Sequence, residues 1–88
     1  MQIIFLERFS KDLDRIKDKT TKERIRKAIE KLEASESLES VPNVKKLTGF
    51  THFYRLRIGD YRIGLIADDK SVELARVAHR KNIYRLFP

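Results

Sequence analysis

The sequence predicts an α+β domain in which a hairpin of two helices packs on one face of a small, mostly antiparallel β-sheet. Three observations lead to this prediction: a short run of branched and aromatic residues near the start, two amphipathic segments after it, and three alternating segments in the second half. The expected order is β-α-α-β-β-β with a short C-terminal helix, in a single domain over residues 1–88.

The first strand is expected over Gln2–Leu6, because QIIFL is rich in the branched and aromatic residues that strands favour. The apolar spacing then changes to that of a helix. Phe9, Leu13 and Ile16 stand at i, i+4 and i+7 and form one apolar stripe. This first helix is expected to end near Lys19.

The second helix is expected to begin at Thr20, since Thr20–Glu23 (TTKE) has the pattern of a capping box. Its apolar stripe consists of Ile25, Ala28, Ile29 and Leu32. Helices this short are marginal alone, so both stripes are expected to lie on a common sheet.

Three further strands are expected after a polar connection over residues 34–43. Residues 53–58 and 61–67 alternate between two faces, and Gly59-Asp60 between them suits a two-residue hairpin. The last strand is expected over residues 71–78, after a turn at residues 68–70. Residues 81–87 are expected to form one or two helical turns.

Arginines gather on the sheet face that the helices leave open. If Tyr54, Leu56 and Ile58 face the helices, the opposite face carries Arg55, Arg57 and Arg62. The two-residue hairpin places Arg57 directly opposite Arg62, an arrangement that destabilises a sheet unless an anion neutralises it. The alternative is a solvated polar face on a half-exposed sheet.

The net charge of +7 is concentrated in the second half of the chain. Residues 1–43 carry ten Lys/Arg and nine Asp/Glu, a net of +1, whereas residues 44–88 carry ten and four, a net of +6. This asymmetry favours an anionic partner such as RNA. The chain has no cysteine, no apolar run of the roughly 20 residues that span a bilayer, and no basic lead-in typical of a signal peptide. We therefore expect a cytoplasmic protein without a membrane partner.

The last expected strand and the segment after it supply further candidate site residues. His79 can exchange a proton near neutral pH, Arg80 can bind phosphate, and Tyr84 can stack on a base. Strand alternation would send His79 and Arg80 to opposite faces unless the strand ends between them, which the sequence leaves open. Additional RNA-binding residues are expected at Lys45, Lys46, Arg76 and Lys81. The absence of an acidic pair or of a metal-ligand cluster argues against a metal and against metal-dependent nuclease chemistry.

Three segments resemble the RelE branch of the RelE/ParE toxin superfamily: LTGF from Leu47, YRLRIGDYRIG over Tyr54–Gly64, and AHRKNIYRLFP over Ala78–Pro88. The resemblance implies a ribosome-dependent mRNA endoribonuclease that uses the 2′-hydroxyl of the RNA as nucleophile, without metal or cofactor. It also implies an acidic antitoxin that neutralises the toxin in a hetero-oligomer.

The resemblance also assigns roles to individual residues. Arg55 and Arg57 match two basic strand positions, and Arg62 and Arg80 match arginines that stabilise the pentacovalent phosphate. Tyr84 matches a tyrosine that stacks on the substrate. Because arginines remain protonated, Arg55 and Arg57 are poor proton acceptors, which leaves His79 as the candidate general base.

Two alternatives of different class stay open. One is a ParE-like inhibitor of a topoisomerase, and the other is an RNA-binding domain without catalytic activity. The sequence of His79, Arg80 and Tyr84 favours the enzyme, since a protein-binding inhibitor needs no phosphate site.

Overall fold

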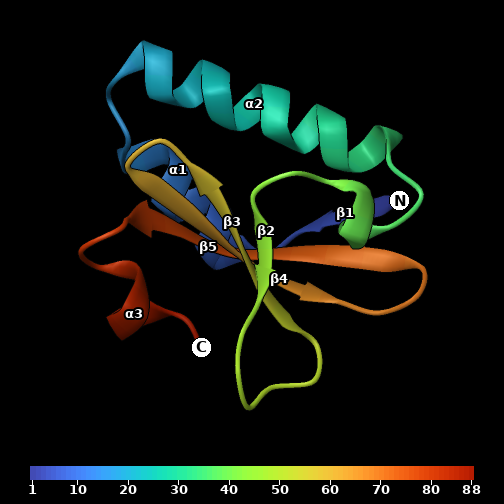
Figure 1. The fold of residues 1–88 in the computed structure, drawn as a ribbon. Coiled ribbons are helices and arrows are strands. Elements are labelled where there is room, and N and C mark those ends of the chain that lie inside the picture. The colour runs from blue at the N-terminus through green and yellow to red at the C-terminus, as the bar shows by residue number, and fades with distance from the viewer.

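The computed structural model, which describes residues 1–88, is an α+β fold with one mixed sheet (Figure 1). The sheet has the strand order β1-β5-β4-β3-β2, in which β1 runs parallel to β5 and all other neighbours are antiparallel. The elements are β1 (Gln2–Phe5), α1 (Glu7–Arg15), α2 (Lys19–Ala34), a short 3₁₀ helix (Leu38–Ser40), β2 (Val44–Lys46), β3 (Phe53–Ile58), β4 (Tyr61–Ala67), β5 (Ser71–His79) and α3 (Ile83–Leu86). The predicted fold class and element order are confirmed, with β2 as an added strand.

Strand β2 was not expected because its three residues, VKK, include two lysines and are too short to show alternation. It forms because β3 offers it a partner: Val44 pairs with Leu56 and Lys45 with Arg55. The addition places Lys45 beside the arginines of β3.

The predicted hairpin between β3 and β4 is confirmed in its register. Ile58 pairs with Tyr61 and Arg57 with Arg62, so only two residues form the turn. Gly59 has φ +57°, and the first position of a two-residue hairpin turn needs such a positive φ, which glycine adopts without strain.

The boundary between the two helices differs from the prediction. Helix α1 ends at Arg15, and the side chain of Asp18 caps α2 by accepting hydrogen bonds from the N–H groups of Thr20 and Thr21. The prediction that Thr20 caps the second helix is therefore wrong by two residues. Aspartate is as good an N-cap as threonine, and Asp18 precedes Thr20 in the chain. The hydrogen bond from the Thr21 hydroxyl, followed by those from the two N–H groups, lowers the pKa of Asp18.

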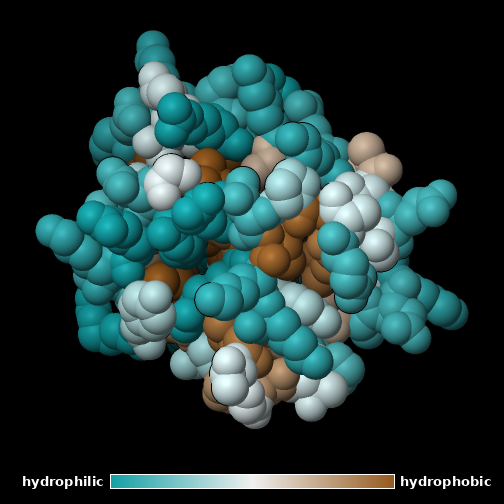
Figure 2. All heavy atoms as spheres, viewed as in Figure 1, coloured by the Kyte–Doolittle hydropathy of each residue, from teal (hydrophilic) through white to brown (hydrophobic).

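Both helices cover one face of the sheet and form the main core with it (Figure 1). Phe9 of α1 and Leu32 of α2 are fully buried against Ile63, Leu65 and Leu74 of the central strands. Each such side chain contributes about 1.5–3 kcal/mol to stability. Hydrophilic residues cover most of the surface on the side shown, with hydrophobic residues exposed between them (Figure 2). None of the helices is long and apolar enough to cross a membrane.

A β-bulge in β5 decides which face its last residues occupy. Gly64 pairs with Arg76 but Leu65 pairs with Leu74, so Ala75 is an extra residue. An extra residue reverses the alternation of everything that follows it. Val77 and His79 therefore face the helices, whereas Arg76 and Ala78 share the side of Gly64 and Arg62.

Candidate functional site

A groove with a volume of about 710 Å³ lies on the sheet face opposite the helices. It is bounded by β2, by the loop after β2, by β3 and by the C-terminal segment. Five of its lining side chains are cationic and none is an aspartate or glutamate. The cationic residues are Lys45, Lys46, Arg55, Arg57 and Arg62, and Tyr84 lines the groove with them.

Neutral oxygens hold the pair of opposed arginines. Arg57 donates to the side-chain oxygen of Asn43 at 3.1 Å, and Arg62 donates to the backbone carbonyls of Gly59 at 2.8 Å and Tyr61 at 2.9 Å. Neither guanidinium forms an ion pair. Two like charges that face each other on neighbouring strands without a carboxylate make a site for an anion.

Arg55 is held by the C-terminal segment. Its Nη2 donates to the carbonyl of Phe87 at 3.0 Å, and its guanidinium carbon lies 4.4 Å from the ring centroid of Tyr84, a cation–π contact. Its Nε is buried and donates to no acceptor. A buried donor in this state lowers stability by about 1–3 kcal/mol. Tyr84 itself is 73% exposed, so most of its ring remains accessible.

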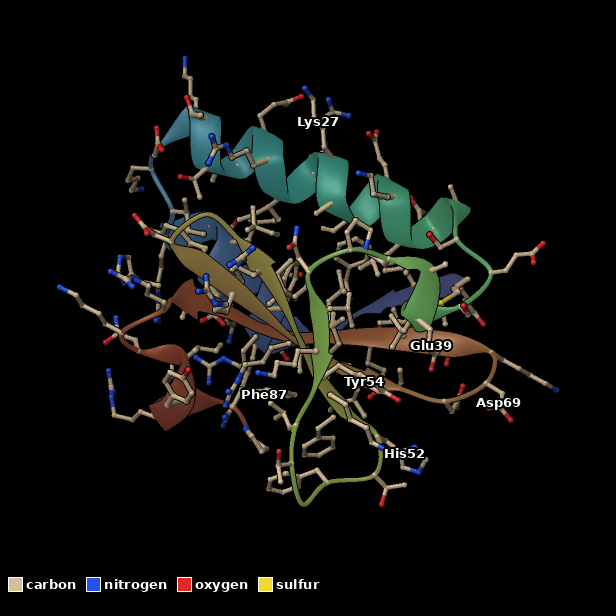
Figure 3. All side chains as sticks on the ribbon, in the orientation of Figure 1. Lys27, Glu39, His52, Tyr54, Asp69 and Phe87 are labelled. Atoms are coloured by element: carbon tan, nitrogen blue, oxygen red, sulfur yellow. The ribbon has the colours of Figure 1, made fainter.

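The C-terminal segment reaches this position because position 64 is glycine. The ring of Phe87 lies against the Cα of Gly64, and a Cβ there would overlap the ring. Ile83, Phe87 and Ala75 form a second, smaller core with Phe53 and Ile66 on this face of the sheet. Figure 3 shows Phe87 on the opposite side of the sheet from α2, which carries Lys27 on its outer surface.

The structure does not bring Arg76 into the groove, and its RNA binding stays a prediction. Its Nε and Nη2 donate to Asp12 of α1 at 2.8 and 3.0 Å, and only 16% of its side chain is exposed. Asp12 also accepts from the N–H of Val77 at 3.1 Å. These hydrogen bonds raise the pKa of the Arg76 guanidinium. Because Asp12 neutralises its charge, Arg76 stabilises the contact between α1 and the edge of β5.

His79 does not join the arginines either. It pairs with Tyr61 on the helix side of the sheet, its ring centroid 5.6 Å from that of Tyr61, and its Nδ1 accepts from the N–H of Lys81. The structure does not bring His79 into the groove lining, and its role as general base stays a prediction.

Arg80 and Lys81 lie outside the groove lining. The N–H of Arg80 donates to the carbonyl of Asp60 at 2.7 Å, and its Nε is 3.8 Å from the carboxylate of Asp60. Arg80 thus flanks the hairpin turn whose Gly59 carbonyl holds Arg62. Arg80 and Lys81 stay predictions as phosphate and RNA ligands.

Sequence reasoning missed several residues of the groove, most clearly Asn43 and Phe50. Asn43 has φ +69° just before β2, where it presents its amide to Arg57. Asparagine tolerates that conformation, and its place after Pro42 is a usable signal for such a turn. Phe50 stands in the LTGF segment, whose aromatic residue was not assigned a role.

Comparisons with known proteins agree with the fold. A family model described as the ParE toxin of the type II toxin–antitoxin system parDE matches residues 3–84. Toxin RelE3 of Methanocaldococcus jannaschii is 38% identical over 89 residues, and the match covers all of both chains.

Solved structures give the same result. The RelB–RelE antitoxin–toxin complex from Methanococcus jannaschii matches with a TM-score of 0.81 and 36% identity, over 97% of this chain and 99% of the other. The archaeal RelE–RelB complex from Pyrococcus horikoshii matches with a TM-score of 0.73 and 24% identity, over 90% and 93% of the two chains. The second match supports the fold alone.

These matches define the class of protein: the chain belongs to the RelE/ParE superfamily of type II toxin–antitoxin toxins. Its identity to Toxin RelE3 along the full chain places it in the RelE branch of that superfamily, as the three resembling segments predicted.

Proposed function

We propose that this chain is a metal-independent endoribonuclease that cuts mRNA on the ribosome and so inhibits translation. The observation that carries the proposal is the groove, in which five cationic side chains and an exposed tyrosine come together without an aspartate or glutamate. Phosphates suit the cations, and the bases of a single strand suit the aromatic ring.

The proposed reaction needs no group beyond the RNA and the protein. The 2′-oxygen attacks the neighbouring phosphorus, the bond from phosphorus to the 5′-oxygen breaks, and a 2′,3′-cyclic phosphate and a 5′-hydroxyl result. The 2′-hydroxyl loses its proton and the 5′-oxygen gains one. Negative charge grows on the phosphate in the transition state, so Arg57 and Arg62, which already face each other, would stabilise it most.

The proposed mechanism gives the main role to the side chains that line the groove. With His79 on the other face of the sheet, the rate enhancement would rest on positioning and electrostatics from groove residues. Arg80 would dock a flanking phosphate beside the hairpin, since its side chain is exposed there and lies outside the groove lining.

The proposed partner is an acidic antitoxin of the kind named in the RelB–RelE complexes. A chain with net charge +7 attracts such a partner, and the two would form a hetero-oligomer. The proposed place of action is the cytoplasm, where ribosomes and mRNA are found.

The test is to induce the chain in cells and to follow mRNA integrity beside DNA damage. We expect mRNA cleavage without DNA damage. Arg62→Ala should lower the single-turnover cleavage rate by about 10²-fold, because it removes charge stabilisation that is strongest in the transition state, and should leave antitoxin binding intact. Lys22→Ala, on the exposed face of α2, is the matched control and should cleave at the parental rate.

A second candidate function is inhibition of a topoisomerase, which the match to the ParE toxin model favours. The same induction experiment separates the two. DNA damage with intact mRNA would support topoisomerase inhibition and contradict the nuclease. Arg80→Ala refines the site: weaker binding with unchanged single-turnover cleavage would make Arg80 a docking residue only.

A further inference from the structure

The loop between β2 and β3 holds one aromatic ring at the mouth of the groove. The N–H of Phe50 donates to the carbonyl of Leu47 at 3.3 Å, and the N–H of Leu47 donates to the carbonyl of Phe53 at 2.9 Å. Gly49, at φ +87°, makes the reversal between them. This turn fixes the backbone of Phe50 beside the two lysines of β2.

Phe50 is the outer end of a column of rings that starts on the sheet. Phe87 lies on Gly64, the ring of Phe53 is 5.4 Å from that of Phe87, and the ring of Phe50 is 5.4 Å from that of Phe53. The planes of Phe50 and Phe53 differ by only 9°, so these two rings are stacked. Phe53 therefore covers one face of Phe50, and the 46% of Phe50 that is exposed belongs mainly to its other face.

The exposed ring of Phe50 lies in the basic groove together with a second exposed ring. The molecule exposes only three large hydrophobic side chains, Phe5, Phe50 and Tyr84, and two of them, Phe50 and Tyr84, line the same basic groove. Each of these two rings is supported from behind, Phe50 by Phe53 and Tyr84 by the guanidinium of Arg55. Supported flat rings next to cations fit a ligand that has planar rings joined by anions.

We propose that Phe50 is a nucleobase-stacking residue, and that Phe50 and Tyr84 each hold one base of a single-stranded RNA whose phosphates lie on the cations between them. The inference rests on the proposed RNA substrate and adds a second base-binding position to it. A planar base continues the parallel stack of Phe50 on Phe53, whereas the aliphatic side chains of a peptide do not, which favours RNA over a protein segment at this ring.

A tryptophan reporter tests the stacking directly, because the chain contains no tryptophan. In the Phe50→Trp variant the only indole stands at the proposed position. We expect its fluorescence to be quenched when a short single-stranded RNA of mixed sequence binds. An abasic ribose-phosphate chain of the same length should bind without quenching. Saturated RNA binding, verified by anisotropy of a labelled RNA, without any quenching would overturn the proposal.

Affinity provides the second measurement. Phe50→Ala should weaken binding of the same RNA by about 5- to 150-fold, the equivalent of the roughly 1–3 kcal/mol that one stacked base contributes. Phe50→Leu keeps the apolar volume and loses the aromatic face, so it should weaken binding nearly as much. Phe5→Ala, which truncates the exposed ring on β1, is the control and should bind as the parent does. Parental binding by Phe50→Leu would reduce Phe50 to an apolar contact and contradict the inference.

The outcomes also separate this inference from the proposed function. If the parental chain bound no RNA, both would fall. If it bound and cut RNA and the Phe50 variants did so equally well, only the stacking role would fall. If the Phe50 variants bound RNA normally but lost the acidic antitoxin, the ring would be part of a protein interface and the inference would be wrong.

Discussion

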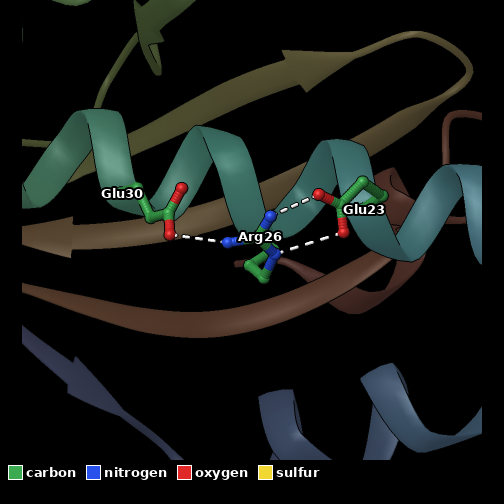
Figure 4. Close-up of polar contacts among 3 residues, drawn as sticks. All are labelled: Glu23, Arg26 and Glu30. Carbon is green, nitrogen blue, oxygen red and sulfur yellow. Dashed lines mark hydrogen bonds and ion pairs between the residues drawn. The ribbon is translucent and has the colours of Figure 1, made fainter.

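The three arginines of the groove and two arginines outside it, Arg26 and Arg76, have opposite surroundings. On α2, Arg26 forms ion pairs with Glu23 and Glu30 (Figure 4), and at the edge of β5 Arg76 forms one with Asp12. In the groove, Arg55, Arg57 and Arg62 donate only to neutral oxygens. The first group is neutralised within the chain, whereas the second keeps its charge for a ligand.

This difference shows why arginines of one protein can differ in their ability to bind an anion. A carboxylate within hydrogen-bonding distance cancels most of the field of a guanidinium, so a count of arginines overstates the binding surface. Figure 4 shows the Glu23–Arg26–Glu30 network on α2, the opposite side of the sheet from the groove. What distinguishes the groove is that its cations lie together and none of them is paired with a carboxylate.

The largest expected effect comes from breaking the pair that holds Arg76. Asp12→Ala leaves a part-buried guanidinium and the buried N–H of Val77 without an acceptor, and we expect the free energy of unfolding to fall by about 3–5 kcal/mol. Denaturant unfolding monitored by circular dichroism measures it. The double variant Asp12→Leu/Arg76→Met removes both charges and should recover much of the loss. A loss in Asp12→Ala below about 1 kcal/mol would mean that this pair is no stronger than an exposed ion pair.

The two groups of arginines also differ in how well the sequence alone predicts their surroundings. Alternation and the two-residue turn predicted the Arg57–Arg62 pairing, because both are local properties of one hairpin. The partner of Arg76 could not be predicted in this way, since Asp12 is 64 residues away and stands in a helix of mixed charge. An acidic residue one position before the apolar Leu13, at the border of the apolar stripe, is the only local sign of its burial.

The face of the sheet that His79 occupies could not be predicted either, for a related reason. Unbroken alternation from Val72 and Leu74 would have put His79 on the face of the arginines, and the bulge at Ala75 reverses it. The sequence of residues 71–79 alone does not predict that bulge, because it arises from the pairing of β5 with β4. Likewise, the position of the C-terminal segment depends on the packing of Phe87 on Gly64, a contact across 23 residues that no periodicity reveals.

A smaller effect on the free energy of unfolding is expected from substitution of Gly64, which accommodates the C-terminal segment beside Arg55. The Cβ of Gly64→Ala would overlap the Phe87 ring, and we expect unfolding to become about 1–3 kcal/mol easier. In a Phe87→Ala background the same substitution should cost little, because its obstacle is gone. Denaturant unfolding of the four proteins gives this coupling. An equal cost of Gly64→Ala in both backgrounds would show that Phe87 is not what position 64 accommodates.

The smallest expected effect compares one arginine from each group through the salt dependence of RNA binding. Affinity for a single-stranded RNA falls with salt because cations of the protein release counterions from phosphates, with a slope of about 0.7 per phosphate neutralised. Arg57→Ala removes an unpaired groove cation and should lower the slope of log affinity against log salt by about that amount. Arg26→Ala removes the same charge from α2, but Glu23 and Glu30 already neutralise it and it lies away from the groove, so the slope should stay at the parental value. Fluorescence anisotropy titrations from low to physiological salt measure both variants on one RNA. Equal reductions by Arg57→Ala and Arg26→Ala would mean that only the net charge matters and that carboxylate pairing does not separate the two groups of arginines.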